Sequence, residues 1–262
     1  MNASDFSVDD ARDPSASSTL AADVRAYVAD SYPHNHGYRV VGADLRPKLQ
    51  LRWRAWRLRK LYPRPLTSLV DLSCSKGYFV LAAAREPSCS RALGIDVHAP
   101  DLAASRAVQA HILAIGSPGS RAIGSPGSRA IGSPGSLAHA RFESMRLHEL
   151  AARIHELGGP FQTALLVNAY QYLYFGSRRC PDAYKDHDAI FGWLRCVCAE
   201  RVIFNNRVEF ARVRGVGRRI GAQERREDDY SSERILRAAA RHFRVTPSGR
   251  LGRNPLWVLD AR

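Results

Sequence analysis

Two kinds of segment alternate along most of this chain. Short apolar runs occur at 69–72, 92–95, 164–167 and 201–204, and segments with helical spacing of apolar residues separate them. Runs without polar alternation are typical of strands that are buried on both faces of a parallel sheet. The pattern therefore predicts an α/β fold in which strand–helix–strand units build one open sheet.

One of these units carries the most distinctive chemistry. Its first apolar run, Leu69–Leu72, ends in a loop of small residues, Ser73-Cys74-Ser75-Lys76-Gly77, which a helical segment follows. Its second apolar run, Ala92–Ile95, ends on Asp96. Such a unit binds ligands at the carboxyl ends of its strands, where the loop and the free N–H groups of the helix meet. An acid that ends the second strand can accept hydrogen bonds from a ribose.

The spacing of this loop resembles the first motif of the class I S-adenosylmethionine-dependent methyltransferases, D-x-G-x-G-x-G. Asp71, Ser73, Ser75 and Gly77 take the four motif positions, and Asp96 takes the place of the ribose-binding acid about twenty residues later. Two of the three glycines are thus serine, which is strained at positive φ. A dinucleotide-binding motif fits less well, because its third glycine would fall on a tyrosine. A turn that binds no ligand is the remaining alternative.

The first part of the chain reads as an extension. Residues 1–20 are acidic and serine-rich, which predicts a disordered tail, and a helical and basic extension at 21–65 precedes the domain at 66–262. We expect a helix over Leu20–Tyr32 and a loop that leads into extended structure. His34 and His36 lie in this loop, but no third metal ligand is near, which favours surface residues over a metal site.

The segment at 49–62, LQLRWRAWRLRKLY, has helical spacing and two apolar sides. One stripe holds Leu51, Ala55, Leu58 and Tyr62, and the opposite stripe holds Leu49, Trp53 and Trp56, with arginines between them. We expect the helix to pack on the sheet and to be covered by the tail. The alternative is an arginine and tryptophan surface that stacks on bases and binds phosphates.

The rest of the chain continues the alternation around one insertion. Three copies of an eight-residue Gly-Ser-Pro unit occupy 113–136, and this composition predicts a flexible exposed loop. The remaining elements are expected as a helix at 101–112, a strand at 138–147, a helix that ends at Leu157, a strand that ends at Asn168, a helix at 186–198, a polar connector at 209–229, a helix at 231–241 and two C-terminal strands. With the resemblance, this order implies a seven-stranded, mostly parallel Rossmann-like methyltransferase sheet with helices on both faces and an antiparallel C-terminal hairpin.

The composition says more about the compartment and the possible partners of the protein than about its activity. The net charge of +14 invites a polyanionic partner, although nearly all of it is arginine, as biased codon usage also produces. The five cysteines lack a C-x-x-C pair, which predicts a reduced, cytoplasmic compartment and no metal site. We expect a soluble protein without membrane contact, since no apolar run has the roughly eighteen residues of a membrane span.

The resemblance implies S-adenosylmethionine as the cofactor. It places the methionine and ribose portions at the loop Ser73–Gly77, which includes Cys74, the ribose hydroxyls at Asp96, and the amino group near Asp71 through water. Many relatives hold the adenine with an acid after the third strand, and Met145 is the candidate in that region here. Methyl transfer itself needs mainly alignment in a dry pocket.

The acceptor side in this family lies just past the fourth strand, at Asn168, Tyr170 and Tyr172. The prolines of the N-P-P-Y motif of base-modifying relatives are absent. The two tyrosines either stack on a planar acceptor or belong to the core, and His187 and Asp188 are more distant candidates for proton removal. Three functions stay open: a methyltransferase for RNA or another acidic or planar substrate, a small-molecule methyltransferase, and an inactive methyltransferase-like binding module.

Overall fold

The computed structural model describes residues 20–31, 37–41, 44–115, 134–213 and 229–262. The predicted tail up to residue 19, the two histidines at 34 and 36, and most of the Gly-Ser-Pro repeat lie outside these ranges.

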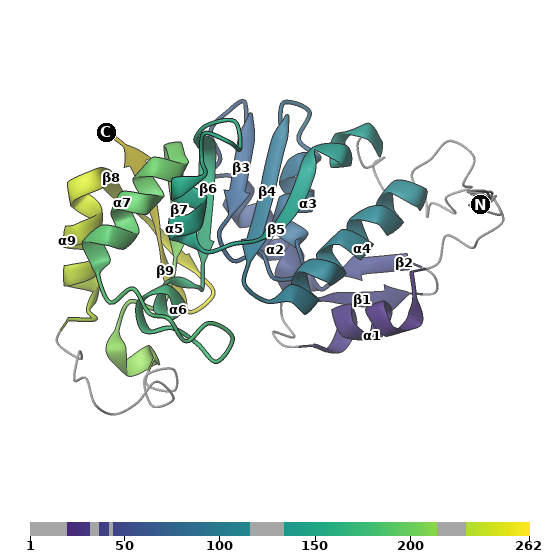
Figure 1. The fold of residues 1–262 in the computed structure, drawn as a ribbon, viewed down its shortest axis with the longest axis horizontal. Helices are drawn as coiled ribbons and strands as arrows, with labels where there is room; N and C mark the ends of the chain where they lie inside the picture. Colours follow the sequence, from purple (N-terminus) through teal and green to yellow (C-terminus); the bar gives the residue numbers. More distant parts are fainter. Residues whose placement is uncertain (1–19, 32–36, 42–43, 116–133, 214–228) are drawn as a thin grey trace, which may run out of the picture.

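Seven strands form the central sheet, in the order β5-β4-β3-β6-β7-β9-β8 (Figure 1). The first five in this order are parallel to their neighbours, whereas β9 runs antiparallel to both β7 and β8. The prediction of a mostly parallel seven-stranded sheet with a C-terminal hairpin is thus confirmed. The bounds are β3 (Ser68–Asp71), β4 (Arg91–Asp96), β5 (Ala140–Ser144), β6 (Phe161–Val167), β7 (Cys198–Asn205), β8 (Phe243–Leu251) and β9 (Asn254–Ala261).

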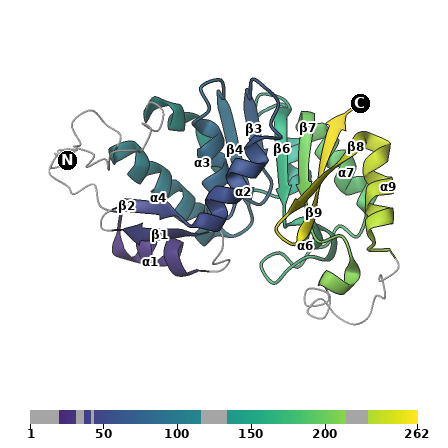
Figure 2. The same cartoon turned by 180° about the vertical axis from the view of Figure 1, so that it is seen from behind.

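Helices cover both faces of this sheet (Figures 1 and 2). Successive side chains of a strand point to opposite faces, so Ala164 and Leu166 of β6 join one hydrophobic cluster while Leu165 and Val167 join another. The first cluster includes side chains of α5 (Leu147–Ala152), α7 (His187–Val197) and α9 (Ser232–His242). The opposite face is covered by α2 (Leu49–Arg59), α3 (Tyr78–Ala84) and α4 (Ala99–Ile115). None of the described helices is both long and apolar enough to span a membrane.

A small N-terminal unit packs beside α4 and is anchored from the sheet. It consists of α1 (Ala22–Asp30) and the antiparallel strands β1 (Tyr38–Val41) and β2 (Asp44–Pro47). Lys76 Nζ, in the loop after β3, donates to Ser31 O at 2.7 Å, and Lys48 Nζ donates to Ala29 O at 2.7 Å. Cations are favourable at the C-terminus of a helix, because unpaired carbonyls and the helix dipole meet there. The loop that follows β3 therefore also holds α1 in place.

The two apolar stripes of α2 have different surroundings. Leu51 and Leu58 are buried against the sheet, as predicted. On the opposite side Leu49, Trp53 and Trp56 are 78%, 46% and 52% exposed. The predicted cover for this stripe, the tail, lies outside the described residues, so its docking there stays a prediction.

Three elements differ from the sequence prediction. α5 ends at Ala152, earlier than the predicted Leu157, and turns follow it. The connector after β7 was expected to be too polar for the core, but Val213 is buried. The unpredicted helix α6 (Tyr170–Phe175) follows β6 directly. Asn206 explains its start, because the Asn206 Oδ1 accepts hydrogen bonds from the amides of Ala169 and Tyr170 at 2.8 and 2.9 Å.

We expect Asn206→Ala to lower the free energy of unfolding by about 2 to 4 kcal/mol. The buried Asn206 side chain also donates from Nδ2 to Leu166 O at 2.7 Å, so its loss leaves two amides and one carbonyl without partners. Chemical denaturation measures the effect. Asn206→Asp keeps the acceptor oxygen at a helix N-terminus and should recover part of the loss. Wild-type stability in the alanine variant would contradict this role.

Candidate functional site

The loop between β3 and α3 adopts the left-handed backbone that the motif requires. Ser75 has φ +48° and Gly77 has φ +76°. Of the two serines at glycine positions, Ser75 thus carries the predicted strain. Its amide donates to Asp96 Oδ2 at 3.0 Å, and its carbonyl accepts a hydrogen bond from Ser105 Oγ at 2.9 Å. These two bonds from neighbouring elements hold the strained residue in place.

Gly77 is required for a second reason, the close packing of α3. A Cβ atom at this position would lie 2.7 Å from the Phe142 ring and 2.9 Å from Ser105 Cβ. Both distances are shorter than van der Waals contact, so a side chain would push α3 away from β5 and α4. Gly77 is thus the one motif glycine that the chain retains. Neither its φ nor the space around it admits a residue with a side chain.

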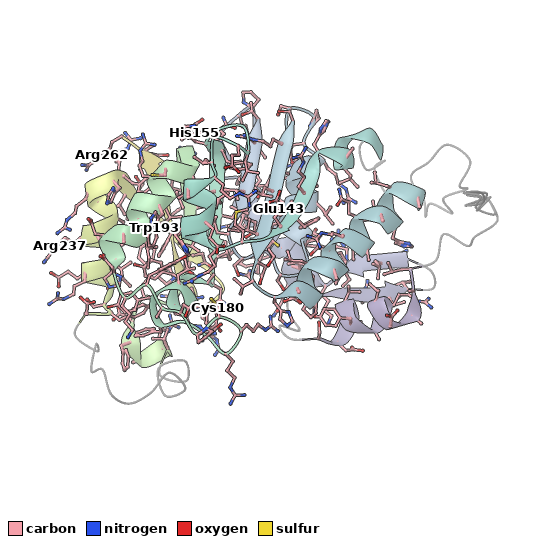
Figure 3. The ribbon with its side chains drawn as sticks, viewed as in Figure 1. Glu143, His155, Cys180, Trp193, Arg237 and Arg262 are labelled. Carbon is pink, nitrogen blue, oxygen red and sulfur yellow. The ribbon has the colours of Figure 1, made fainter. Side chains whose placement is uncertain are left out.

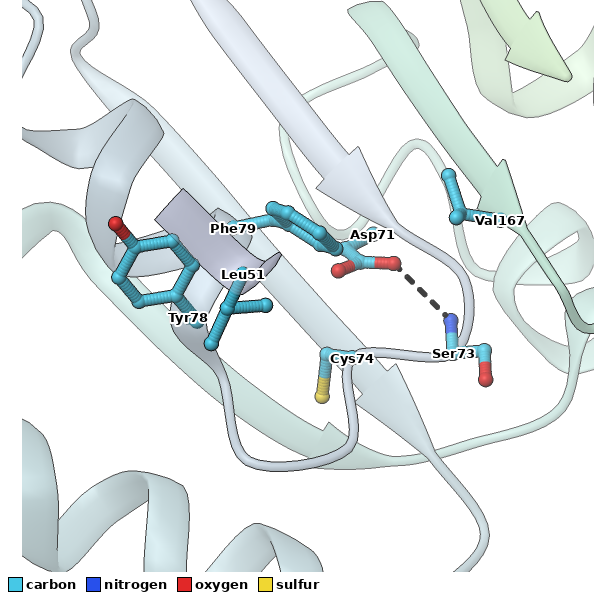
Figure 4. A pocket seen from close by; sticks show the side chains of 7 residues that line it. All are labelled: Leu51, Asp71, Ser73, Cys74, Tyr78, Phe79 and Val167. Atoms are coloured by element: carbon cyan, nitrogen blue, oxygen red, sulfur yellow. Dashed lines mark hydrogen bonds between the residues drawn. The ribbon is translucent and has the colours of Figure 1, made fainter. Parts of the chain in front are cut away.

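Asp71, at the end of β3, is a buried acid that lacks a full set of partners (Figure 4). It is 2% exposed; its Oδ1 accepts a 3.4 Å hydrogen bond from the Ser73 amide, and its Oδ2 has no partner among the described residues. Burial is the main reason why the pKa of Asp71 is raised to about 7, and the nearby Asp96 adds to it. The adjoining cavity of about 10 Å³ has room for roughly one water molecule. It is lined by Leu51, Asp71, Ser73, Cys74, Tyr78, Phe79 and Val167.

Asp96 lies at the end of the neighbouring strand with its carboxylate fixed in orientation. Besides the Ser75 amide, the His98 amide donates to it, at 3.0 Å to Oδ1. Its pKa is raised because burial outweighs the stabilisation from these two amides. A carboxylate offers about four acceptor positions, so two stay available for hydroxyl groups. Val97, which follows it, is 37% exposed and adds an apolar surface beside the acid.

Two other predicted cofactor residues have side chains that are buried in hydrophobic clusters. Met145 is buried in the cluster that also contains Leu72 and Ile95, and its contact with an adenine stays a prediction. Cys74 packs between the sheet and α4, in the cluster with Phe142. Its side chain also lines the cavity beside Asp71, so its contact with a cofactor stays a prediction.

The predicted acceptor-side residues differ in how deeply they are buried. Asn168 is only partly buried and has φ +58°, and its amide donates to Asn205 O at 2.7 Å. Tyr170 is 0% exposed, stacks on Phe191 and has its hydroxyl 2.6 Å from His187 Nδ1. The core alternative therefore holds for Tyr170, whereas Tyr172 is half-buried and stays a candidate.

The more distant candidates for proton removal already have hydrogen-bond or ion-pair partners within the fold. His187 is buried, with Nε2 3.0 Å from Asp229 O, and burial lowers its pKa. Asp188 pairs with Arg241 and His242 on the outer side of α7.

One group beside the site was not predicted from the sequence. Asp101, at the start of α4, accepts hydrogen bonds from Tyr27 Oη at 2.8 Å and from Arg179 Nη1 at 2.9 Å. Arg179 belongs to the loop after α6, which Figure 3 marks at Cys180, at the edge of the sheet. These bonds connect α1, α4 and the acceptor-side loop across one end of the site. Sequence separations of 74 and 78 residues leave no local signal for them.

Comparisons with known proteins identify the fold. No protein-family model matches the sequence, and no curated protein matches it either. Among solved structures, EvdMO1 aligns with a TM-score of 0.55 at 12% identity, over 91% of this chain and 46% of that protein. The N-methyltransferase NodS from Bradyrhizobium japonicum WM9, in complex with S-adenosyl-L-homocysteine, aligns with a TM-score of 0.50 at 12% identity, over 81% and 88% of the two chains.

An O-methyltransferase from Bacillus cereus, also in complex with S-adenosyl-L-homocysteine, has a TM-score of 0.50 at 10% identity, over 80% and 81% of the chains. This chain thus spans less than half the length of EvdMO1 and most of the length of the other two. The fold is that of the class I methyltransferases. In the described ranges, no group of three or more His, Cys, Asp or Glu side chains could hold a metal ion.

We expect Asp71→Asn to gain stability relative to the wild type as the pH rises. In the unfolded chain Asp71 loses its proton near pH 3.8, whereas in the folded chain it keeps the proton up to about pH 7. Its contribution to stability is therefore fully present below pH 3.8 and is lost as the pH rises to 7. Between pH 5 and pH 8 the free energy of unfolding should shift in favour of the variant by about 2 to 3 kcal/mol. Parallel pH profiles for both proteins would contradict the raised pKa.

Proposed function

We propose that this chain binds S-adenosylmethionine and transfers its methyl group to a small-molecule acceptor. The observation that carries the proposal is the joint geometry of Ser75 and Asp96. A left-handed loop at the carboxyl end of β3 is bonded to an oriented, partly exposed acid at the end of β4. This arrangement suits a ribose at the acid and a chain of small polar groups at the loop.

The residues fit the cofactor in three places. Asp96 is oriented to accept the ribose hydroxyls, and Val97 offers apolar surface to the adjoining base. The backbone of Ser73–Gly77 would hold the methionine portion. Asp71 has one oxygen without a partner among the described residues, at a cavity of the size of one water, which suits a water-mediated contact to the amino group.

The bound cofactor would supply an electrophilic methyl group, and the protein has to align the acceptor with it. Asn168 and Tyr172 lie just beyond the carboxyl end of β6. This end lies at the same edge of the sheet as the proposed cofactor site, so both residues can contact an acceptor there. Asn168 can orient a polar acceptor atom, since its amide side chain both donates and accepts hydrogen bonds. Tyr172 can flank a planar group.

Two observations favour a small acceptor over RNA. The fold neighbours with a named activity are described as N- and O-methyltransferases, and two of them span lengths similar to this chain. Trp53 and Trp56 are exposed on the side of α2 opposite the one that packs on the sheet, whereas Asn168 follows the end of β6. An inactive binding module shares the cofactor site with an enzyme, so transfer of a labelled methyl group distinguishes the two.

Asp96→Ala should weaken the binding of S-adenosylmethionine by about 1 to 3 kcal/mol, through the loss of charge-assisted hydrogen bonds to the ribose. Titration calorimetry measures this directly. The matched control is Asp188→Ala, which removes an acid on α7 that pairs with Arg241 and His242. The control should bind like the wild type. Equal affinities in all three proteins would refute the site.

The two tyrosines should respond differently to truncation. Tyr170→Ala leaves a cavity in the core and should lower the free energy of unfolding by about 3 to 5 kcal/mol. Tyr172→Ala should lose less stability and keep wild-type affinity for S-adenosylmethionine, since it lies on the acceptor side. Denaturation and calorimetry on both variants test this. If Tyr172→Ala is as destabilising as Tyr170→Ala, Tyr172 is a core residue and its acceptor role is wrong.

A further inference from the structure

The turn between β8 and β9 lies against the acceptor side of the proposed site. Asn205, the last residue of β7, donates from Nδ2 to Asn254 O at 3.1 Å and to Pro255 O at 2.7 Å. The Asn254 side chain in turn lies 3.5 Å from Asn168 Oδ1. The turn is therefore fixed to the carboxyl edge of the sheet, next to the residue proposed to orient the acceptor.

Arginines converge on this turn. Arg212 Nη1 donates to Arg253 O at 2.7 Å, and Arg250 Nη2 donates to the same oxygen at 2.6 Å. Arg253 itself is exposed on the turn. Two guanidinium groups that share one carbonyl oxygen lie within a few ångströms of each other, where like charges repel. We refer to Arg212, Arg250 and Arg253 as the turn arginines.

A fourth guanidinium approaches the same hairpin from α2. Arg57 Nη2 lies 3.7 Å from the position that a Cβ atom of Gly249 would take. The hairpin therefore has positive charge from α2 on one side and from the segment after β7 on the other.

No carboxylate in the described ranges pairs with the turn arginines. Other arginines nearby in the sequence are neutralised. Arg244, on the same strand β8, pairs with Asp260, and Arg237 and Arg241 of α9 pair with Glu233 and Asp188. Among the described residues, the lack of a paired acid is thus a local property of the turn.

We propose that the turn arginines bind an anionic group of the methyl acceptor, which makes the acceptor a small acidic molecule. This inference rests on the proposed methyltransferase function and on the position of the turn beside Asn168. Planar guanidinium groups bind phosphate and carboxylate oxygens in pairs, and an anion between Arg250 and Arg212 would offset their repulsion. A cluster gathered around one carbonyl suits a single anionic group better than an extended polyanion.

The test compares two double variants of equal charge. Arg250→Gln with Arg253→Gln removes two turn arginines, and Arg237→Gln with Arg241→Gln removes two paired arginines from α9. Calorimetry at constant ionic strength measures binding of inorganic phosphate and of citrate to each protein, after thermal melting has shown that both variants fold. We expect the turn variant to bind at least one anion about tenfold more weakly than the wild type, and the control variant to bind it unchanged.

The two anions identify the group: loss of phosphate binding alone indicates a phosphorylated acceptor, and loss of citrate binding indicates a carboxylate. The proposal is overturned if the wild type binds neither anion, or if both variants lose affinity equally. It is also overturned in favour of a nucleic-acid surface if a single-stranded oligonucleotide binds far more tightly than either anion and depends on Trp53 and Trp56.

Binding of S-adenosylmethionine to the same proteins separates this inference from the function on which it rests. The turn variant should bind S-adenosylmethionine like the wild type, because the turn lies on the acceptor side. If the wild type binds S-adenosylmethionine but neither anion, the acidic acceptor is wrong and the methyltransferase proposal stands. If the wild type binds an anion through the turn arginines but no S-adenosylmethionine, the methyltransferase proposal fails and the anion's role as acceptor fails with it.

Discussion

The hydrogen bond from the Ser75 amide to Asp96 is the constraint on which the rest of the site depends. It fixes the loop after β3 to the end of β4, while the Ser75 carbonyl is bonded to Ser105 on α4. The next residue, Lys76, reaches in the opposite direction and holds the C-terminus of α1. One short loop thus connects the sheet, α4 and the N-terminal unit. A serine can stay at positive φ here because three neighbouring elements determine its position.

The same loop concentrates features that cost stability. Ser75 has a left-handed backbone and a buried hydroxyl, and Asp71 is a buried acid; the Ser75 hydroxyl and one Asp71 oxygen have no hydrogen-bond partner in the part of the chain that the structure describes. Each of these features lowers the stability of the fold, and both lie where β3 connects to α3. Proteins retain such local conflicts mainly where a ligand can relieve them. A bound polar molecule would satisfy the Asp71 oxygen through the adjoining water-sized cavity, and this gives the strain a functional interpretation.

Local patterns in the sequence were sufficient for the strand–loop–strand unit, because buried strands and small loop residues have short-range signals. The seven-stranded sheet followed from the resemblance of the element order to that of the class I methyltransferases. Local patterns were insufficient to predict how deeply a side chain is buried and which residues far apart in the sequence contact each other. The aromatic residues after β6 did not reveal that Tyr170 is fully buried and Tyr172 only half-buried. The spacing of apolar residues predicts which face of an element packs inward, but not how completely that face is covered. Helix α6 begins where it does because of Asn206, which lies 36 residues away. The Asp101 group is likewise assembled only by the fold.

The position of charge carries more information than its total. A net charge of +14, nearly all from arginine, could result from codon usage alone, and on α9 the arginines are indeed matched by acids. Biased codon usage acts on the whole gene and gives no reason for arginines to gather at one turn where no described acid pairs with them. The carboxyl edge of the sheet is instead divided, with acids at the ends of β3 and β4 and arginines beside β7 and β9. A neutral or cationic acceptor would gain nothing from the arginines, whereas an acidic acceptor would be attracted to them. This division would place an acidic acceptor on the Asn168 side of the site before any specific contact forms.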